Sequence, residues 1–504
     1  MRKKHHKQPQ LLAGLTVTDV AAEGKCLIRT DDGVIFVEGR PGHPMPAPGD
    51  VVDIRVFNQK KQYREALVER VVTPSPVRTQ PFCEHFGVCG GCKWQHIQYD
   101  EQLRFKQQQV IDHLTRIAKV PLPGGSAASM RPILAAHPTQ YYRNKLEFTI
   151  ADGRWLTQAE VQTTERMDPR VVGFHVPGRF DKVLPIQHCY LQPDPSNDIR
   201  LAVTDYLFAN NLAAYNLKTH EGYLRTLIIR TADTTGQVMV TLQVAQDHPQ
   251  TLAALLDHLL ERFPQITSLN YIINTKKNDN YGDQEVINYA GTPYIEETMD
   301  AGVGTSGAVA SAPGTSEVNQ VLTFRVNAKS FYQTNAKQAF ALYSVARDMA
   351  GLTGNELVYD LYTGTGTIAL FVARQARYVV GIEYVEAAVA DAGVNAEVNG
   401  ISNASFHAGD MKNLLTEEFF AQHGHPDVVI TDPPRAGMDE AVVRQLIKAA
   451  PQKIVYISCN TATQARDLAW LDEAYRVDAV QPVDMFPHTH HVENVVLLVK
   501  KNVQ

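Results

Sequence analysis

The chain has 504 residues, a formal net charge of −6 and 44% hydrophobic residues. This length predicts two to four domains, each large enough to bury its own core. The slight negative charge excludes a uniformly basic nucleic-acid binder, so any such contact must use local basic patches. No apolar run approaches the ~20 residues of a membrane span. Because the basic N-terminus also lacks the apolar core of a signal peptide, we expect a cytoplasmic protein with no membrane partner.

Short segments of alternating apolar and polar residues dominate residues 1–76. Examples are Leu15–Val20, Val34–Val37 and Val51–Val56, which Gly and Pro turns separate. This pattern predicts a small antiparallel β-barrel. A purely structural barrel without a ligand is the alternative.

Three of the six cysteines are clustered. Cys83, Cys89 and Cys92 follow a Cys-x5-Cys-x2-Cys spacing, too close for independent buried thiols, and the glycines between them let backbone amides turn toward sulfur. The six cysteines lack the dense pairing of a secreted disulfide scaffold, so this cluster indicates a metal site. Cys189 is the candidate fourth ligand, and the residues alone leave zinc and an iron–sulfur cluster equally open. With no ligand position left open, a structural or positioning role is favoured over redox chemistry.

Residues 77–321 are expected to form a central domain. The spacing of Leu103, Val110 and Leu114 predicts a helix over residues 100–120, which we expect to pack on the catalytic domain. From residue 140 to 295 predicted strands and helices alternate, which indicates an α+β fold. Arg143 and Lys145, interleaved with the aromatic residues Tyr141, Tyr142 and Phe148, suit phosphate contact and base stacking with RNA, although core packing explains the aromatic residues equally well. The low-complexity stretch Ala301–Thr315 is interpreted as a flexible surface insertion.

The last predicted domain, residues 322–504, is organised around the apolar strand Leu357–Leu361. Gly364 and Gly366 follow this strand and precede an apolar helix, so the backbone of the turn can approach a ligand closely. A second apolar strand ends in Glu383, 23 residues after Asp360, where a βαβ unit places an acid to accept ribose hydroxyls. The pair predicts a Rossmann-like α/β domain with a nucleotide-type pocket.

Three later stretches bring reactive groups toward the same sheet edge. Asp432 and two prolines end one apolar strand, Cys459 follows the buried strand Lys453–Ser458, and Glu493 directly precedes the strand Val495–Val499. We therefore expect an acid, a thiol and a carboxylate to face one crevice.

Four motifs carry a family resemblance. Asp360-Leu-Tyr-Thr-Gly-Thr-Gly-Thr, Asp432-Pro-Pro-Arg-Ala-Gly, Ile457-Ser-Cys-Asn and His490-His-Val-Glu-Asn resemble, in this order, the signatures of the S-adenosylmethionine-dependent RNA (uracil-5-)-methyltransferases. The 23S rRNA branch with an iron–sulfur cluster is the most similar. The first barrel resembles the TRAM module, a barrel of the oligonucleotide-binding (OB) type.

The resemblance implies the roles of the site residues. Cys459 is expected to add to carbon 6 of uracil, and Glu493 to remove the proton from carbon 5. A [4Fe–4S] cluster, rather than zinc, is expected on Cys83, Cys89, Cys92 and Cys189. The residues expected to bind S-adenosylmethionine are Gln333, Tyr362, Gly364, Thr367, Glu383 and Asp432. The family often has asparagine at position 367, so Thr367 lacks the amide of that residue.

The expected activity is methylation of carbon 5 of a uridine in 23S rRNA, with no obligate protein partner evident. One alternative is a tRNA (uracil-5-)-methyltransferase, although the tRNA enzymes resemble only the central and catalytic parts. Another is an RNA-binding ribosome assembly factor with an inert catalytic domain. A 5-methylcytosine enzyme is disfavoured, since Arg435 stands where a cysteine would follow Asp-Pro-Pro.

Overall fold

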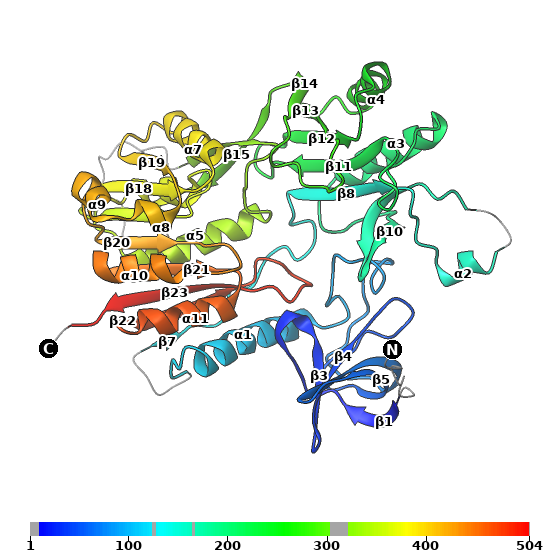
Figure 1. Ribbon diagram of the computed structural model, residues 1–504, viewed down its shortest axis with the longest axis horizontal. Coiled ribbons are helices and arrows are strands. Elements are labelled where there is room, and N and C mark those ends of the chain that lie inside the picture. Colours follow the sequence, from blue (N-terminus) through cyan, green and yellow to red (C-terminus); the bar gives the residue numbers. More distant parts are fainter. Residues whose placement is uncertain (1–9, 123–127, 164–166, 303–320, 503–504) are drawn as a thin grey trace, which may run out of the picture.

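The computed structural model describes residues 10–122, 128–163, 167–302 and 321–502. Three large sheets follow one another along the chain (Figure 1), the first in blue, the second in cyan and green, and the third in yellow to red. The third sheet occupies the left of this view, and the other two lie on its right. Among the described helices, none is long and apolar enough to cross a membrane.

Six short strands form the first sheet. In spatial order they are β1 (Gln10–Thr16), β5 (Val51–Gln59), β6 (Tyr63–Thr73), β4 (Gly33–Glu38), β3 (Cys26–Thr30) and β2 (Asp19–Val20), with the short helix η1 (Ala22–Gly24) after β2. The predicted all-antiparallel arrangement is wrong at one position, because β4 and β6 pair in parallel. The β5–β6 hairpin turns the chain back, so that β6 runs beside β4 in the same direction.

The two edges of this sheet belong to one segment of chain. No pairing between β1 and β2 closes the sheet within the described residues, so a closed barrel is not seen. Only Val17 and Thr18 separate the two strands. The Val17 N–H donates to the Asp50 carbonyl and the Thr18 N–H to the Leu27 carbonyl, each at 2.8 Å. One bent segment therefore bonds to both sides of the sheet.

The predicted helix at residues 100–120 is present as α1 (Tyr99–Arg116). It packs against α11 (Thr461–Leu471) and β22 (Tyr475–Val483) of the third sheet (Figure 1). Val110 and Leu114, both fully buried, join the core of that sheet. Further along, β7 (Ser129–Met130) pairs with β22 and adds an edge strand to the same sheet. This part of the predicted central domain is thus built onto the last one.

The second sheet has seven strands and two covering helices. In spatial order the strands are β10 (Arg179–Pro185), β9 (Val171–Val176), β8 (Lys145–Ala151), β11 (Leu224–Thr231), β12 (Val238–Val244), β13 (Ile266–Ile273) and β14 (Ile287–Gly291). The helices are α2 (Gln158–Val161), which is short, and α3 (Ser196–Ala209) and α4 (Pro249–Arg262), whose apolar sides enter the core. A separate hairpin of β15 (Tyr294–Asp300) and β16 (Val321–Asn327) follows. The predicted insertion lies, apart from Ala301 and Gly302, outside the described residues.

The third sheet confirms the predicted Rossmann-like fold. Its order is β19-β18-β17-β20-β21-β23-β22-β7, and the core strands β17 to β21 are parallel while β23 is antiparallel to both neighbours. The strands not yet given are β17 (Leu357–Leu361), β18 (Tyr378–Glu383), β19 (Ala404–Ala408), β20 (Val428–Thr431), β21 (Lys453–Ser458) and β23 (Glu493–Lys500). The helices are α5 (Ala336–Ala350), α6 (Thr367–Ala373), α7 (Glu386–Val398), α8 (Met411–Leu414), α9 (Glu417–His423) and α10 (Glu440–Ala449).

Both faces of the third sheet are buried, as its near-continuous apolar strands predict. Val358 and Val455 belong to the core on the side of α5, α6 and α7. Tyr359 and Ile454, their neighbours in the chain, belong to the core on the side of α1, α10 and α11. Only the strand ends are left free to form a site.

Candidate active site

Four parallel strands and one antiparallel strand converge at one edge of the third sheet. Tyr362, Glu383, Asp432 and Cys459 directly follow or end β17, β18, β20 and β21. The antiparallel strand β23 begins at this edge with Glu493, because Asn494 pairs with Ser458. The carboxyl ends of parallel strands are the usual place for a ligand in an open α/β sheet. The edge therefore gathers the acid, the thiol and the carboxylate that the sequence predicts.

The turn after β17 is held by two carboxylates. The Gly364 N–H donates to Glu383 Oε2 (3.1 Å), which connects the glycine turn to the end of the next strand. Asp360 Oδ2 accepts bonds from Thr363 Oγ1 (2.5 Å) and from the Ala369 N–H (3.0 Å) in α6. Its other oxygen, Oδ1, is buried and has no hydrogen-bond partner among the described residues. Burial raises the pKa of Asp360 to about 7.

A cavity of about 480 Å³ opens beside this turn. Tyr362, held at a left-handed φ of 63°, lines it on one side. The other lining residues include Tyr384, Asp410, Lys412 and Pro434, which the sequence reasoning missed. Asp410 follows the edge strand β19 and caps α8, so its position after a strand was the available signal. Asp410, the exposed Tyr384 and the apolar side chains in the lining, such as Met411 and Met438, suit a nucleoside.

Two predicted ligands lie on helix starts near the turn. Thr367 is the first residue of α6, and its Oγ1 lies 3.3 Å from the hydroxyl of Tyr343 in α5. Gln333 precedes α5 and is 8% exposed, and its carbonyl accepts a bond from Asn144 Nδ2 (3.0 Å) in the chain before the second sheet. Neither residue lines the cavity beside Tyr362.

Cys459 and Glu493 are electrostatically linked. Burial and the charges of Glu493 and Asp432 raise the pKa of the Cys459 thiol to about 11. Burial and Asp432 raise the pKa of Glu493 to about 8, and burial and Asp360 raise that of Asp432 to about 7. Three carboxyl groups thus disfavour one another's ionised forms at this edge.

Arg435 opposes these effects. Its charge acts to lower the pKa of both Cys459 and Glu493. Its backbone carbonyl accepts bonds from Asn460 Nδ2 (3.0 Å) and Thr463 Oγ1 (3.1 Å), two residues that follow Cys459 closely in the chain. The sequence reasoning used this arginine only to disfavour a cytosine substrate. The structure adds it to the site.

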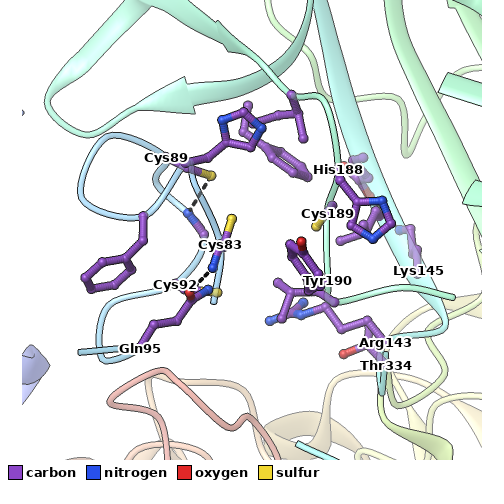
Figure 2. Close-up of a pocket in the computed structure, with 18 residues that line it drawn as sticks. Cys83, Cys89, Cys92, Gln95, Arg143, Lys145, His188, Cys189, Tyr190 and Thr334 are labelled. Atoms are coloured by element: carbon purple, nitrogen blue, oxygen red, sulfur yellow. Dashed lines mark hydrogen bonds and ion pairs between the residues drawn. The ribbon is translucent and has the colours of Figure 1, made fainter. Parts of the chain in front are cut away.

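The four predicted cysteine ligands line a second cavity, of about 360 Å³. Figure 2 shows Cys83, Cys89 and Cys92 on one wall and Cys189, with His188 and Tyr190, on the opposite wall. Burial raises the pKa of Cys89 to about 12 and that of Cys92 to about 11. Among the described residues, no group of three or more His, Cys, Asp or Glu is close enough to hold a single metal ion.

The nucleotide-type turn, the acid after the second strand and the doubly wound sheet define a class I S-adenosylmethionine-dependent methyltransferase. A profile of the tRNA (Uracil-5-)-methyltransferase family matches residues 315–501. Over 95% of its length the chain is 54% identical to a protein of Bacteroides thetaiotaomicron, of which the match covers 99% and which is named an uncharacterized RNA methyltransferase. A protein of the same description from Chlorobaculum tepidum is 38% identical, with 95% of each chain covered. The chain belongs to the family of S-adenosylmethionine-dependent RNA (uracil-5-)-methyltransferases.

A solved structure resembles the chain over nearly its whole length. It is the tRNA (uracil-54, C5)-methyltransferase of Pyrococcus abyssi in complex with S-adenosyl-L-homocysteine. The two are 26% identical with a TM-score of 0.69, and the match covers 97% of this chain and 99% of the other. The likeness therefore includes the first sheet and the cysteine-bearing segment as well as the catalytic sheet.

Proposed function

We propose that this enzyme methylates carbon 5 of a uridine in a structured RNA through a covalent adduct between Cys459 and carbon 6 of the base. The observation that carries the proposal is the meeting of Cys459, Glu493 and Asp432 at one sheet edge beside a nucleotide-type turn. A lone cysteine after a buried strand is ordinarily a packing residue. A cysteine facing a buried carboxyl group suits a nucleophile paired with a base.

The chemistry divides between the two residues. The Cys459 thiolate forms a bond to carbon 6, and the electron pair of the 5,6 double bond moves to carbon 5 and the neighbouring carbonyl, which makes carbon 5 nucleophilic. Carbon 5 would then bond to the electrophilic methyl group that bound S-adenosylmethionine supplies, and S-adenosyl-L-homocysteine would leave with the electron pair of the broken sulfur–methyl bond. The Glu493 carboxylate then takes the proton from carbon 5, the 5,6 double bond re-forms, and the bond between sulfur and carbon 6 breaks to return the thiolate. Arg435 favours the anionic forms of both residues.

The cofactor pocket is proposed from the turn outward. Glu383 would accept the ribose hydroxyls, with Gly364 allowing close approach of the backbone and Tyr362 lining the nucleoside cavity. Gln333, Thr367 and Asp432 are assigned to the methionine end and the uracil edge on the motif resemblance. Asp360 Oδ1 at the same turn is buried and has no hydrogen-bond partner among the described residues, so a polar ligand group bound there could satisfy it.

The RNA substrate has two candidates. The motifs resemble the 23S rRNA branch, and this is the first candidate. The second is tRNA, which the full-length likeness to the Pyrococcus abyssi tRNA enzyme supports. That likeness covers the first sheet and the cysteine-bearing segment, so their presence no longer favours rRNA over tRNA. We assign residues 1–76 to a TRAM-like module, because one bent segment bonds to both edges of its sheet, 77–321 to a central RNA-binding domain, and 322–504 to catalysis.

The cysteine cavity is proposed to hold a [4Fe–4S] cluster on Cys83, Cys89, Cys92 and Cys189. A zinc ion draws four sulfurs to within ~2.3 Å of itself, whereas here a cavity of about 360 Å³ separates the walls. Arg200 supports an anionic occupant. It is 1% exposed, and its hydrogen bonds among the described residues go to neutral oxygens, those of Ile186, Gln187 and Asn197. A charged Cys189 would raise the pKa of Arg200. Thiolates around a cluster would compensate this buried cation. A structural or RNA-positioning role follows, since no ligand position is open.

The decisive experiment is nucleoside mass spectrometry. Unmodified 23S rRNA and tRNA are incubated separately with the purified enzyme and methyl-labelled S-adenosylmethionine, and 5-methyluridine is mapped by fragment analysis. Label in 23S rRNA alone supports the first candidate, and label in tRNA alone supports the second. Label in neither, with RNA binding intact, would favour an RNA-binding assembly factor and overturn the proposed activity.

A further inference from the structure

The loop that joins β22 to β23 ends at the proposed base. Val483, the last residue of β22, pairs with Glu493, the first residue of β23, so Asp484–Val492 forms the whole hairpin loop. The conformation of this loop therefore sets where the Glu493 side chain begins. The hydrogen bonds that hold the loop come mainly from outside the third sheet.

The start of the loop is bonded to α1. Lys106 and Asp484, both with fully buried side chains, form an ion pair of 2.6 Å. Lys106 Nζ also donates to the Phe486 carbonyl (3.0 Å), and the Tyr99 hydroxyl donates to the second oxygen of Asp484 (2.8 Å). A buried ion pair with these additional bonds fixes the geometry of the groups it joins.

The middle of the loop is strained at His488. Its φ is 62°, a left-handed conformation that is unfavourable for a non-glycine residue and persists only where surrounding contacts impose it. The Lys93 and Trp94 N–H groups, next to Cys92, donate to the His488 carbonyl at 2.8 and 3.0 Å. The Phe82 ring lies 5.0 Å from the His488 ring, edge to face. His488 is thus held by contacts from the cysteine-bearing segment.

Gln102 of α1 also bonds to His488. It is fully buried, and its Oε1 accepts the His488 N–H (2.9 Å) while its Nε2 lies 3.2 Å from His488 Nδ1. The same Nε2 donates to the carbonyls of Trp94 (3.0 Å) and Ile97 (2.8 Å). One amide therefore connects the strained loop residue, the cysteine-bearing segment and α1.

We propose that Gln102 is a positioning residue for Glu493: it holds His488 in the left-handed conformation and thereby places the base at carbon 5. This inference rests on the proposed function. Without the amide, His488 loses the bond to its N–H and relaxes toward negative φ, which displaces the chain on the way to Glu493. Gln102 does not line the cofactor cavity and contacts no reacting group.

A displaced Glu493 should slow one particular step, the removal of the proton from carbon 5. Formation of the bond between Cys459 and carbon 6, and methyl transfer, do not need Glu493. Removal of the carbon 5 proton does, so a displaced base leaves the methylated base bound to the enzyme through the intact sulfur–carbon bond. The variant should then complete one methyl transfer per enzyme and accumulate a denaturation-resistant RNA adduct. A general loss of folding would instead remove methyl transfer and adduct together.

The test compares two glutamines of the same helix. Gln102→Met removes the buried amide at nearly constant volume, and Gln108→Met makes the same change at an exposed site whose amide contacts only Asp112 among the described residues. Single-turnover methyl transfer, steady-state turnover and adduct on denaturing gels are measured, with Glu493→Gln as the reference for a missing base. We expect Gln102→Met to lose on the order of 10- to 100-fold in turnover, to keep the single-turnover rate and to accumulate adduct. Gln108→Met should match the wild type.

Wild-type turnover and the Glu493→Gln trap test the proposed function, and the difference between the two methionine variants tests the inference. Wild-type behaviour of Gln102→Met would overturn the inference. Joint loss of methyl transfer and adduct in Gln102→Met would also overturn it, unless His488→Ala turns over more slowly than His488→Gly. A wild type without methyl transfer would overturn the function and the inference together.

A second pair tests the backbone conformation without touching Gln102. His488→Gly and His488→Ala both remove the ring, but glycine adopts positive φ freely whereas alanine does not. His488→Ala should therefore turn over about fivefold more slowly than His488→Gly and trap more adduct. Equal turnover, or slower turnover in the glycine variant, would show that the left-handed conformation does not position the base.

Discussion

Glu493 and Cys459 occupy adjacent strand ends because Asn494 pairs with Ser458 in antiparallel register. The pairing brings together two residues that are separated by 34 positions in the chain. It also has an electrostatic consequence, since the charge of Glu493 contributes to the raised pKa of the Cys459 thiol, about 11. The free enzyme therefore holds its nucleophile mostly as a thiol, and its base near the midpoint of titration at neutral to mildly alkaline pH.

Replacing the nucleophile should separate catalysis from binding. In Cys459→Ala the bond to carbon 6 cannot form, so methyl incorporation should fall by more than about 1,000-fold. RNA binding should persist, because the thiol is small and the surrounding strand ends are unchanged. Methyl incorporation from labelled S-adenosylmethionine and filter binding of the same RNA provide the two measurements. Undiminished methylation in this variant would rule out the covalent mechanism.

The pH dependence should report Glu493 and Arg435. The mechanism needs a carboxylate on Glu493 and a thiolate on Cys459, so turnover should rise with pH through about 8, the pKa of Glu493, and continue to rise toward about 11, the pKa of Cys459. In Arg435→Met the pKa of both groups rises further, because the lowering charge is gone, and the rising limb should move to higher pH by roughly one unit. Arg435→Lys keeps a cation and is the matched control. An unshifted limb in Arg435→Met at saturating RNA would contradict this role.

The buried carboxyl group of Asp360 should make stability fall as pH rises. Its folded pKa of about 7 lies above that of an unfolded aspartate, so between these values the folded state keeps a proton that the unfolded chain has lost. The contribution is thus fully present at low pH and lost as pH rises through about 7. In Asp360→Asn the drop in Tm between pH 5 and pH 7.5 should be smaller by roughly 3 °C. Scanning calorimetry of both proteins at several pH values measures this, and parallel curves would refute it.

Two glycines of the cofactor turn should respond differently to alanine. Both have left-handed φ, 55° at Gly364 and 81° at Gly366. A Cβ on Gly364 meets no atom within 4 Å, whereas one on Gly366 lies 3.0 Å from the Ala392 Cβ and 3.2 Å from the Phe406 ring. Gly366→Ala should therefore be about 1 kcal/mol less stable than Gly364→Ala.

Gly364→Ala should affect cofactor binding more than stability. The space beside Gly364 is open in the protein, so an alanine there should weaken S-adenosyl-L-homocysteine binding more than it weakens folding. Denaturant unfolding and calorimetric titration of each variant give both quantities. Equal stabilities of Gly364→Ala and Gly366→Ala would show that the crowding at Gly366 is relieved.

The cysteine cavity should carry iron and acid-labile sulfide. Cys189→Ser removes the sulfur ligand on one wall of the cavity and should abolish both, together with visible absorption. Cys26→Ser is the matched control, because Cys26 is a buried cysteine of the first sheet whose thiol donates to the Pro46 carbonyl (3.4 Å). Metal analysis of anaerobically purified protein is the measurement. Zinc in place of iron, or equal metal content in the two variants, would contradict the cluster.

Local sequence pattern was sufficient for the catalytic sheet. An apolar strand, a turn with Gly364 and Gly366, and a strand ending in Glu383 specify a βαβ unit, because each of these features depends only on residues close to it in the sequence. The hydrogen bond between Gly364 and Glu383 is the direct result. The first sheet was harder, since the parallel pairing of β4 and β6 depends on which strands meet and not on their alternation.

The sequence by itself determined the sheet, its turn, and the residue types delivered to its edge, because backbone geometry fixes where each strand ends. Only the tertiary structure decided the surroundings of those residues. Arg435 beside Cys459, and Gln102 bonded to His488 from a position 386 residues earlier, involve partners that no local pattern relates. Burial also shifts the pKa of Glu493 to about 8, and burial depends on everything packed around it. Long-range packing, which is cooperative and non-local, therefore sets the reactivity of groups that the sequence names.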